Sequence, residues 1–135
     1  GTKIITVMFA GVSTAAGADQ QVQLGDSVGL ETTGYTSHST GFDGGSAFAS
    51  SQLTTAAHLN NDAGATTVVD GWIIFTLQDS STNTWVWHGF ASASSTAQWM
   101  TTMGVKSLSA ELTQLKILLS ASTFDAGAVN ISYSG

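Results

Sequence analysis

The sequence predicts an all-β protein, an antiparallel β-sandwich or jelly-roll-like domain. Apolar and polar residues alternate with a period of two in several segments, which is typical of strands with one buried face. Clusters of Gly, Asn, Asp and Ser separate these segments, and because the chain has no proline these residues must build every turn. Seven to nine short strands with turns between them favour two packed antiparallel layers. The length of 135 residues fits one domain, residues 1–135.

Two strands are predicted near the beginning of the chain. Residues 2–12 alternate so that Ile5, Val7 and Phe9 share one face. Residues 20–25 alternate apolar and Gln side chains, which predicts a half-buried strand. Residues 15–19, rich in Ala and Gly, are interpreted as a hairpin connection between these two segments. The start at Gly1, without an initiator Met, indicates a processed N-terminus or a piece of a longer protein.

A hairpin in the middle of the chain carries the strongest strand pattern. Residues 67–77 are apolar on both faces, which suits a central strand covered on both sides. The turn-forming residues 79–83 follow, and the chain returns over residues 84–91 with Trp85 and Trp87 on the same face.

Three other segments are less regular. Residues 106–119 carry Leu at both helical and strand spacing, and we favour a strand because a lone helix would interrupt a nearly complete sandwich. Residues 36–65 are rich in Gly, Ser and Asn and are interpreted as long surface loops with one short strand near residues 47–53. Residues 125–127 predict a turn before a last strand at residues 128–133.

Composition excludes several classes of function. Three Lys, no Arg and a net charge of −6 cannot neutralise phosphates on one surface, so we expect no nucleic-acid partner. The chain has no Cys for a disulfide, a zinc–thiolate site or a thiol nucleophile. No apolar run approaches about 18 residues, so we expect no membrane insertion. Low charge combined with apolar residues on both strand faces favours a domain that packs against copies of itself.

Residues 21–35, QVQLGDSVGLETTGY, carry a resemblance to a known family. They resemble a "QLGDSGGIETSGY" signature of virion-associated proteins of tailed bacteriophages, which are described as tail-fibre or structural proteins. Val28 stands where that signature has its second Gly. Further blocks are similar in the same order along the chain, and they lie at residues 7–13, 77–85, 106–112 and 123–131.

This resemblance implies a β-rich structural domain on the virion surface, in a tail fibre or tail tip. It implies a homotrimer that contacts other virion proteins and, through residues 36–65, a glycan or protein of the host surface. Two alternatives remain open, a capsid decoration protein and a lectin-like carbohydrate-binding module. The resemblance also supports a strand within residues 106–119.

Few residues suggest a ligand site, and none suggests catalysis. Exposed aromatic rings with nearby polar groups are ordinary sugar contacts, and loop histidines could contact a ligand or an ion. Asp26 is interpreted as a turn residue beside the glycines of the signature segment, with a cation site formed by Asp26 and Glu31 as the alternative. No Gly-x-Ser-x-Gly elbow or motif that pairs two carboxylates is present, so we expect no enzyme, metal site or cofactor. The candidate ligand-binding residues are Tyr35, His38, Phe42, Asp43, His58 and Trp85.

Overall fold

The computed structural model describes residues 1–43, 46–59, 64–93 and 98–135, and for residues 46–49 it describes the backbone only. These residues form ten β-strands and no helix. The strands are β1 (Ile4–Thr14), β2 (Gln20–Gly25), β3 (Thr36–Asp43), β4 (Ser46–Leu53), β5 (Ala57–His58), β6 (Val69–Asp79), β7 (Thr84–Ala93), β8 (Gln98–Ser107), β9 (Gln114–Leu119) and β10 (Phe124–Ser134).

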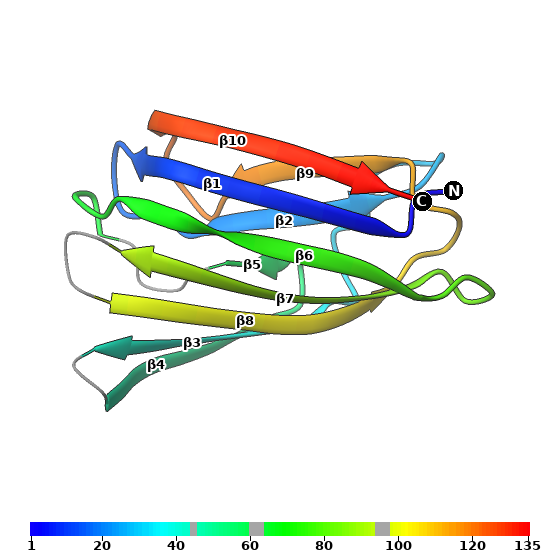
Figure 1. Cartoon of the computed structure of the whole chain (residues 1–135), viewed down its shortest axis with the longest axis horizontal. Helices are drawn as coiled ribbons and strands as arrows, with labels where there is room; N and C mark the ends of the chain where they lie inside the picture. Colours follow the sequence, from blue (N-terminus) through cyan, green and yellow to red (C-terminus); the bar gives the residue numbers. More distant parts are fainter. Residues whose placement is uncertain (44–45, 60–63, 94–97) are drawn as a thin grey trace.

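The strands form two antiparallel sheets packed face to face, which confirms the predicted β-sandwich (Figure 1). The larger sheet has seven strands in the order β10-β1-β6-β7-β8-β3-β4, and the smaller has three in the order β5-β2-β9. The predicted central hairpin is present as β6 and β7, with Leu77 opposite Trp85. A large sheet faced by a small one leaves part of the large sheet's inner side without a covering strand.

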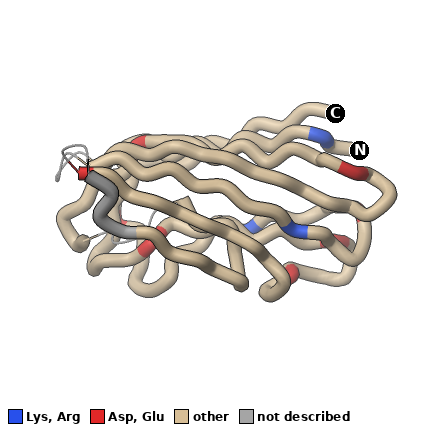
Figure 2. The backbone as a smooth tube through the Cα atoms, turned by 90° about the horizontal axis from the view of Figure 1, so that it is seen from below, with Lys and Arg blue, Asp and Glu red and all other residues tan. Residues whose placement is uncertain are grey.

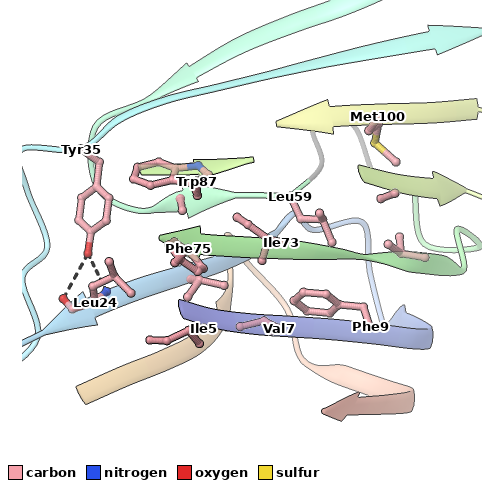
Figure 3. Packing of buried hydrophobic residues seen from close by; sticks show 14 of the residues in the cluster. Ile5, Val7, Phe9, Leu24, Tyr35, Leu59, Ile73, Phe75, Trp87 and Met100 are labelled. Atoms are coloured by element: carbon pink, nitrogen blue, oxygen red, sulfur yellow. Dashed lines mark hydrogen bonds between the residues drawn. The ribbon is translucent and has the colours of Figure 1, made fainter. Parts of the chain in front are cut away.

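The core lies between the two sheets and follows the predicted alternation. Ile5, Val7 and Phe9 of β1 point into it, as do Ile73 and Phe75 of β6 (Figure 3). Each such side chain contributes roughly 1.5–3 kcal/mol when it is removed from water. The apolar face of each long strand therefore fixes which side of the large sheet receives the small one.

The predicted hairpin between the first two strands is wrong. β1 pairs with β6 and β10, whereas β2 pairs with β5 and β9, so residues 15–19 cross from one sheet to the other. β2 is also more buried than predicted. It is the central strand of the small sheet, and its Gln23 side chain is buried and donates a hydrogen bond to the Thr55 carbonyl at 3.1 Å.

Within residues 36–65 the predicted short strand near residues 47–53 is confirmed as β4. The interpretation of the rest as long loops is wrong for the described residues, because β3 and β5 also lie there, and residues 44–45 and 60–63 lie outside the described residues. Ser37 and Ser39 of β3 are buried while His38 between them is exposed. This alternation uses hydroxyl side chains in place of apolar ones, so hydrophobicity alone did not reveal it.

Two further expectations are resolved at the end of the chain. Residues 125–127 form no turn but lie inside β10, where Gly127 has a φ of 95° and the register with β1 shifts. Within residues 106–119 no helix forms, and the favoured strand is confirmed as β9.

Candidate functional site: the open face of the large sheet

The outer face of the large sheet carries a broad apolar surface that no other part of the described chain covers. Its alternate residues point away from the small sheet, so the expectation that residues 67–77 are covered on both sides is wrong for the outer one. Eight large apolar side chains on this face are at least 36% exposed. We call this surface the open face, defined by Ile4, Met8, Phe42, Trp72, Phe90, Trp99, Met103 and Val105.

The strand register places these side chains next to one another. Met8 of β1 lies opposite Trp72 of β6, and Trp72 lies opposite Phe90 of β7. The Trp72 ring also meets the His88 ring edge-on, with 5.5 Å between ring centroids. Because cross-strand neighbours lie about 5 Å apart, the apolar residues form one continuous surface across several strands.

A shallow hollow lies at one corner of the open face. Phe42, Phe90, Trp99 and Thr101 line a volume of about 360 Å³. The rings of Phe90 and Trp99 meet at 69° with 6.1 Å between centroids, and the Trp99 side chain is 59% exposed. Thr101 supplies the one hydroxyl of this lining. The hollow fits an apolar side chain better than a ligand that requires many hydrogen bonds.

Charge is nearly absent from the open face. Asp70 lies on this side of the large sheet near the beginning of β6 and accepts a hydrogen bond from the Gly11 N–H at 2.7 Å, whereas none of the eight residues that define the open face is charged. Long stretches of the strands carry neither a Lys nor an Asp or Glu (Figure 2). Protein–protein interfaces are depleted in charge and enriched in Trp, Phe and Met at their centres, and the open face has this composition.

Three of the predicted ligand-binding residues lie inside the sandwich. Tyr35, His58 and Trp85 are each at most 2% exposed. The imidazole of His58 forms hydrogen bonds with the hydroxyls of Ser37 at 2.8 Å and Ser51 at 2.7 Å. All three side chains are therefore buried within the sandwich, and Trp85 also lines a cavity of about 270 Å³.

The other three predicted residues are exposed but do not form one site. His38 and Phe42 lie on the open face in β3, whereas Asp43 ends that strand. The sequence did not single out Phe90 or Met103. The available signal was the apolar character of both faces of the strands, which we interpreted as burial on both sides.

The acidic residues of the signature segment bind protein groups. The Asp26 carboxylate accepts hydrogen bonds from the N–H of Val28 at 2.8 Å and the hydroxyl of Ser109 at 2.5 Å. Glu31 accepts one from the Ser109 N–H at 2.6 Å and forms an ion pair with Lys106. These contacts favour the turn interpretation over a cation site, and in the described part of the chain no three His, Asp or Glu residues lie close enough to hold a metal ion.

These contacts also shift the pKa values of both carboxyl groups. The Ser109 hydroxyl, followed by the Val28 N–H, lowers the pKa of Asp26. For Glu31, burial acts to raise the pKa, but hydrogen bonds and the charge of Lys106 outweigh it, so that the pKa is lowered. Both groups are therefore held as carboxylates that join β2 to the connection after β8.

Comparisons with protein-family models, with curated proteins and with solved structures gave no match. In the described residues no helix is long and apolar enough to cross a membrane.

Proposed function

We propose that this chain is a non-enzymatic structural domain of a bacteriophage virion, of tail-fibre or tail-tip type. It assembles with copies of itself through the open face and helps the particle to attach to the host surface. The observation that carries the proposal is the extent of uncovered, nearly uncharged apolar surface on one side of the large sheet. The resemblance of residues 21–35 to the phage signature supplies the virion context.

The area and charge of the open face suit contact with further copies of the chain. Five strands about 4.8 Å apart and about seven residues long present roughly 600 Å². A standard interface takes roughly 800 Å² from each partner, so this face supplies most of what a stable contact needs. The eight residues that define the open face include no Asp, Glu or Lys, so copies of the chain can meet there with little repulsion.

We propose three copies, as the resemblance implies, and light scattering after size exclusion tests this number. One assembly of three copies has a mass of about 41 kDa, three times the subunit mass of 13.8 kDa. Met103→Glu places a charge on the open face and is expected to abolish assembly through this face. The Met103 side chain is 57% exposed, so the fold should tolerate this change.

Ser80→Glu is the matched control, because it adds the same charge at an exposed turn away from the open face. A monomeric wild-type protein at micromolar concentration, or a Met103→Glu variant with unchanged mass, contradicts assembly through this face. An image of the intact particle with this chain assigned tests the location. Density on the tail supports the proposal, and density on the capsid would favour the decoration alternative.

A further inference from the structure

One side of the sandwich is open, where the edge strands of both sheets lie. β10 is the last strand of the large sheet and β9 is the last strand of the small sheet, and both lie along the same side (Figure 1). Among the described strands β10 pairs with β1 alone. The second edge of β10 therefore faces outward along its whole length.

The main-chain register shows which residues of β10 have groups at this free edge. Lys3 donates its N–H to the Ser134 carbonyl of β10 at 2.8 Å and accepts a hydrogen bond from the Leu77 N–H at 2.8 Å, so the main-chain groups of Ser134 point towards β1. Ile4 lies opposite Ser134, and the register runs without a shift from there to Ala128. Because these groups alternate along an antiparallel strand, the N–H and C=O of residues 129, 131 and 133 point to the free edge.

The side chains of the same three residues point towards the space between the sheets. Val129, Ile131 and Tyr133 lie opposite the core residues Phe9, Val7 and Ile5 of β1. Yet Ile131 is 49% exposed and Tyr133 is 76% exposed. A groove of about 230 Å³ runs beside them towards β9, and its lining includes Ile5, Leu115, Ile131 and Tyr133. Core-facing apolar side chains thus lie next to unused main-chain hydrogen-bonding groups.

β10 also lacks the features that prevent an edge strand from pairing. Natural edges are blocked by Lys, by Pro, by short length or by bulges. β5 has two residues, and β9 carries Lys116 in its middle. Residues 128–134 of β10 contain no charged residue and no Pro, and the bulge at Gly127 lies before them.

We propose that β10 pairs with β10 of a second copy of this chain, antiparallel and about a two-fold axis centred on Ile131. In this register Ile131 lies opposite Ile131 of the second copy, and Val129 lies opposite Tyr133. All three residues then use their outward N–H and C=O groups in the new ladder. The two large sheets become one continuous sheet, and the exposed apolar side chains of both copies fill the space between the two open sides.

The charges on β10 are compatible with this arrangement. Its one charged residue is Asp125, near the beginning of the strand. In the proposed register the two copies of Asp125 lie twelve residues apart, about 41 Å at roughly 3.4 Å per residue. Salt screens charges at that distance. The contact uses neither residues nor sheet face assigned to the open face, so it would link assemblies that the open face builds.

A cysteine cross-link tests the register, and the absence of native Cys makes the result easy to interpret. In a hydrogen-bonded antiparallel pair the two Cα atoms lie about 5.5 Å apart, inside the range of roughly 4.4–6.8 Å that a disulfide spans. We expect Ile131→Cys to form a covalent dimer under mild oxidation, in good yield and independently of dilution in the low micromolar range.

Val129→Cys is the matched control on the same strand and the same face. Its two copies would lie four residues apart, about 14 Å at roughly 3.4 Å per residue, which is too far for a disulfide. Equal cross-linking of both variants would indicate random collision and overturn the proposal. No cross-link from Ile131→Cys would overturn it as well.

A second variant separates this contact from the one at the open face. Ile131→Lys places two like charges opposite each other at the centre of the pairing, and the half-exposed position should tolerate it in the monomer. In the Met103→Glu background, where the open-face contact is absent, we expect it to convert a dimer of about 28 kDa, twice the subunit mass of 13.8 kDa, into a monomer in light scattering, with an unchanged circular dichroism spectrum.

The cross-link of Ile131→Cys should persist when Met103→Glu is added. A cross-link without open-face assembly would contradict the proposed trimer and leave the β10 contact standing. Assembly through the open face without a cross-link would contradict the β10 contact and leave the proposed trimer standing.

Discussion

Nζ of Lys106 and a carboxylate oxygen of Glu31 form an ion pair that lies almost entirely inside the sandwich. The Lys106 side chain is 7% exposed and that of Glu31 is 22% exposed. The ammonium group also lies 5.5 Å from the ring centroid of Tyr35. This pair joins the end of β8 to the segment after β2, so it holds one end of the small sheet against the large one.

Glu31→Gln is expected to lower the free energy of unfolding by about 3 kcal/mol at pH 7, because it leaves the buried charge of Lys106 without its carboxylate. Urea titration followed by tryptophan fluorescence measures the change. Glu111→Gln is the control, since the Glu111 side chain is 74% exposed and its ion pair with the N-terminus spans 3.9 Å. A loss no larger than the control's contradicts a structural role for the pair.

The same pair predicts an acid dependence. The pKa of Glu31 is lower in the folded than in the unfolded chain. The ionised carboxylate therefore contributes fully to the unfolding free energy when the pH lies above the pKa of the unfolded chain, near 4.5. This contribution is lost as the pH falls below 4.5 and through the lower folded pKa. The unfolding free energy of Glu31→Gln should therefore fall less steeply below pH 4.5 than that of the wild type. Parallel curves for the two proteins would argue against this assignment.

His58 predicts a second pH dependence in a different range. Burial, followed by the charge of His38, lowers the pKa of His58 from 6.5 to about 4. The unfolded chain thus binds a proton between pH 6.5 and 4 that the folded chain does not. Stability is complete above about pH 6.5 and falls by about 3 kcal/mol as the pH is lowered to 4.

His58→Gln should remove this dependence between pH 6.5 and 4, although it lowers stability at pH 7. His88→Gln provides the comparison, because His88 is exposed on the outer side of β7. Chemical denaturation at several pH values, or direct titration of the His58 ring by NMR, measures the effect. A His58 ring that titrates near pH 6.5 in the folded protein is the result that the structure does not allow.

The hydroxyl of Tyr35 holds the end of β2. It accepts a hydrogen bond from the Leu24 N–H at 2.7 Å (Figure 3) and donates one to the Glu31 carbonyl at 3.0 Å. Burial raises the pKa of Tyr35 to about 12, so the hydroxyl keeps its proton at every ordinary pH. Tyr35→Phe leaves the buried Leu24 N–H without this acceptor and is expected to cost about 1–3 kcal/mol.

Thermal unfolding monitored by circular dichroism measures this loss. Tyr133→Phe serves as the control, since the Tyr133 side chain is 76% exposed and removal of its hydroxyl should change little. If the two variants unfold at the same temperature, the Tyr35 hydroxyl does not stabilise β2.

The sequence predicts correctly the strands that alternate large apolar residues with smaller or polar ones. It does not predict a strand whose alternation is polar, or which strands share a sheet. β1, β6 and β7 alternate Val, Ile, Phe and Trp with smaller or polar residues, and the structure confirms them. β3 alternates Ser with His and Thr, a pattern that hydrophobicity does not mark. The error at residues 15–19 has another cause, because neighbouring strands along a chain need not share a sheet and only long-range pairing decides it.

The open face, our candidate functional site, could not be predicted from local sequence pattern either. An apolar residue such as Trp72 has the same pattern in the sequence whether a second layer covers it or solvent does. Whether another layer packs on that face depends on the tertiary fold, and no local pattern encodes it. The chemistry of Tyr35 and Trp85 predicts ligand contacts, but the packing of both layers around them places them in the core.

Gly104 of β8 leaves space for the indole of Trp87. A Cβ atom at residue 104 would overlap both the Trp87 ring and the main-chain carbonyl of Thr36 on the neighbouring strand. Trp87 is 3% exposed and packs against Phe75 with 5.6 Å between ring centroids, so the ring has little room to move. Overpacking of this kind typically costs about 1–3 kcal/mol, and we expect Gly104→Ala to lower the unfolding free energy by that amount.

Gly64→Ala is the matched control for this prediction. A Cβ atom there would lie 3.5 Å from the Thr67 hydroxyl oxygen, an ordinary contact in an exposed segment. Its unfolding midpoint in urea should stay within error of the wild type or rise slightly, because Ala restricts the unfolded chain more than Gly does. Near-ultraviolet circular dichroism should also change for Gly104→Ala, since the Trp87 ring must shift. If Gly104→Ala left both the tryptophan signal and the unfolding free energy unchanged, β8 and β3 could move apart at this point without destabilising the fold, and the prediction would be wrong.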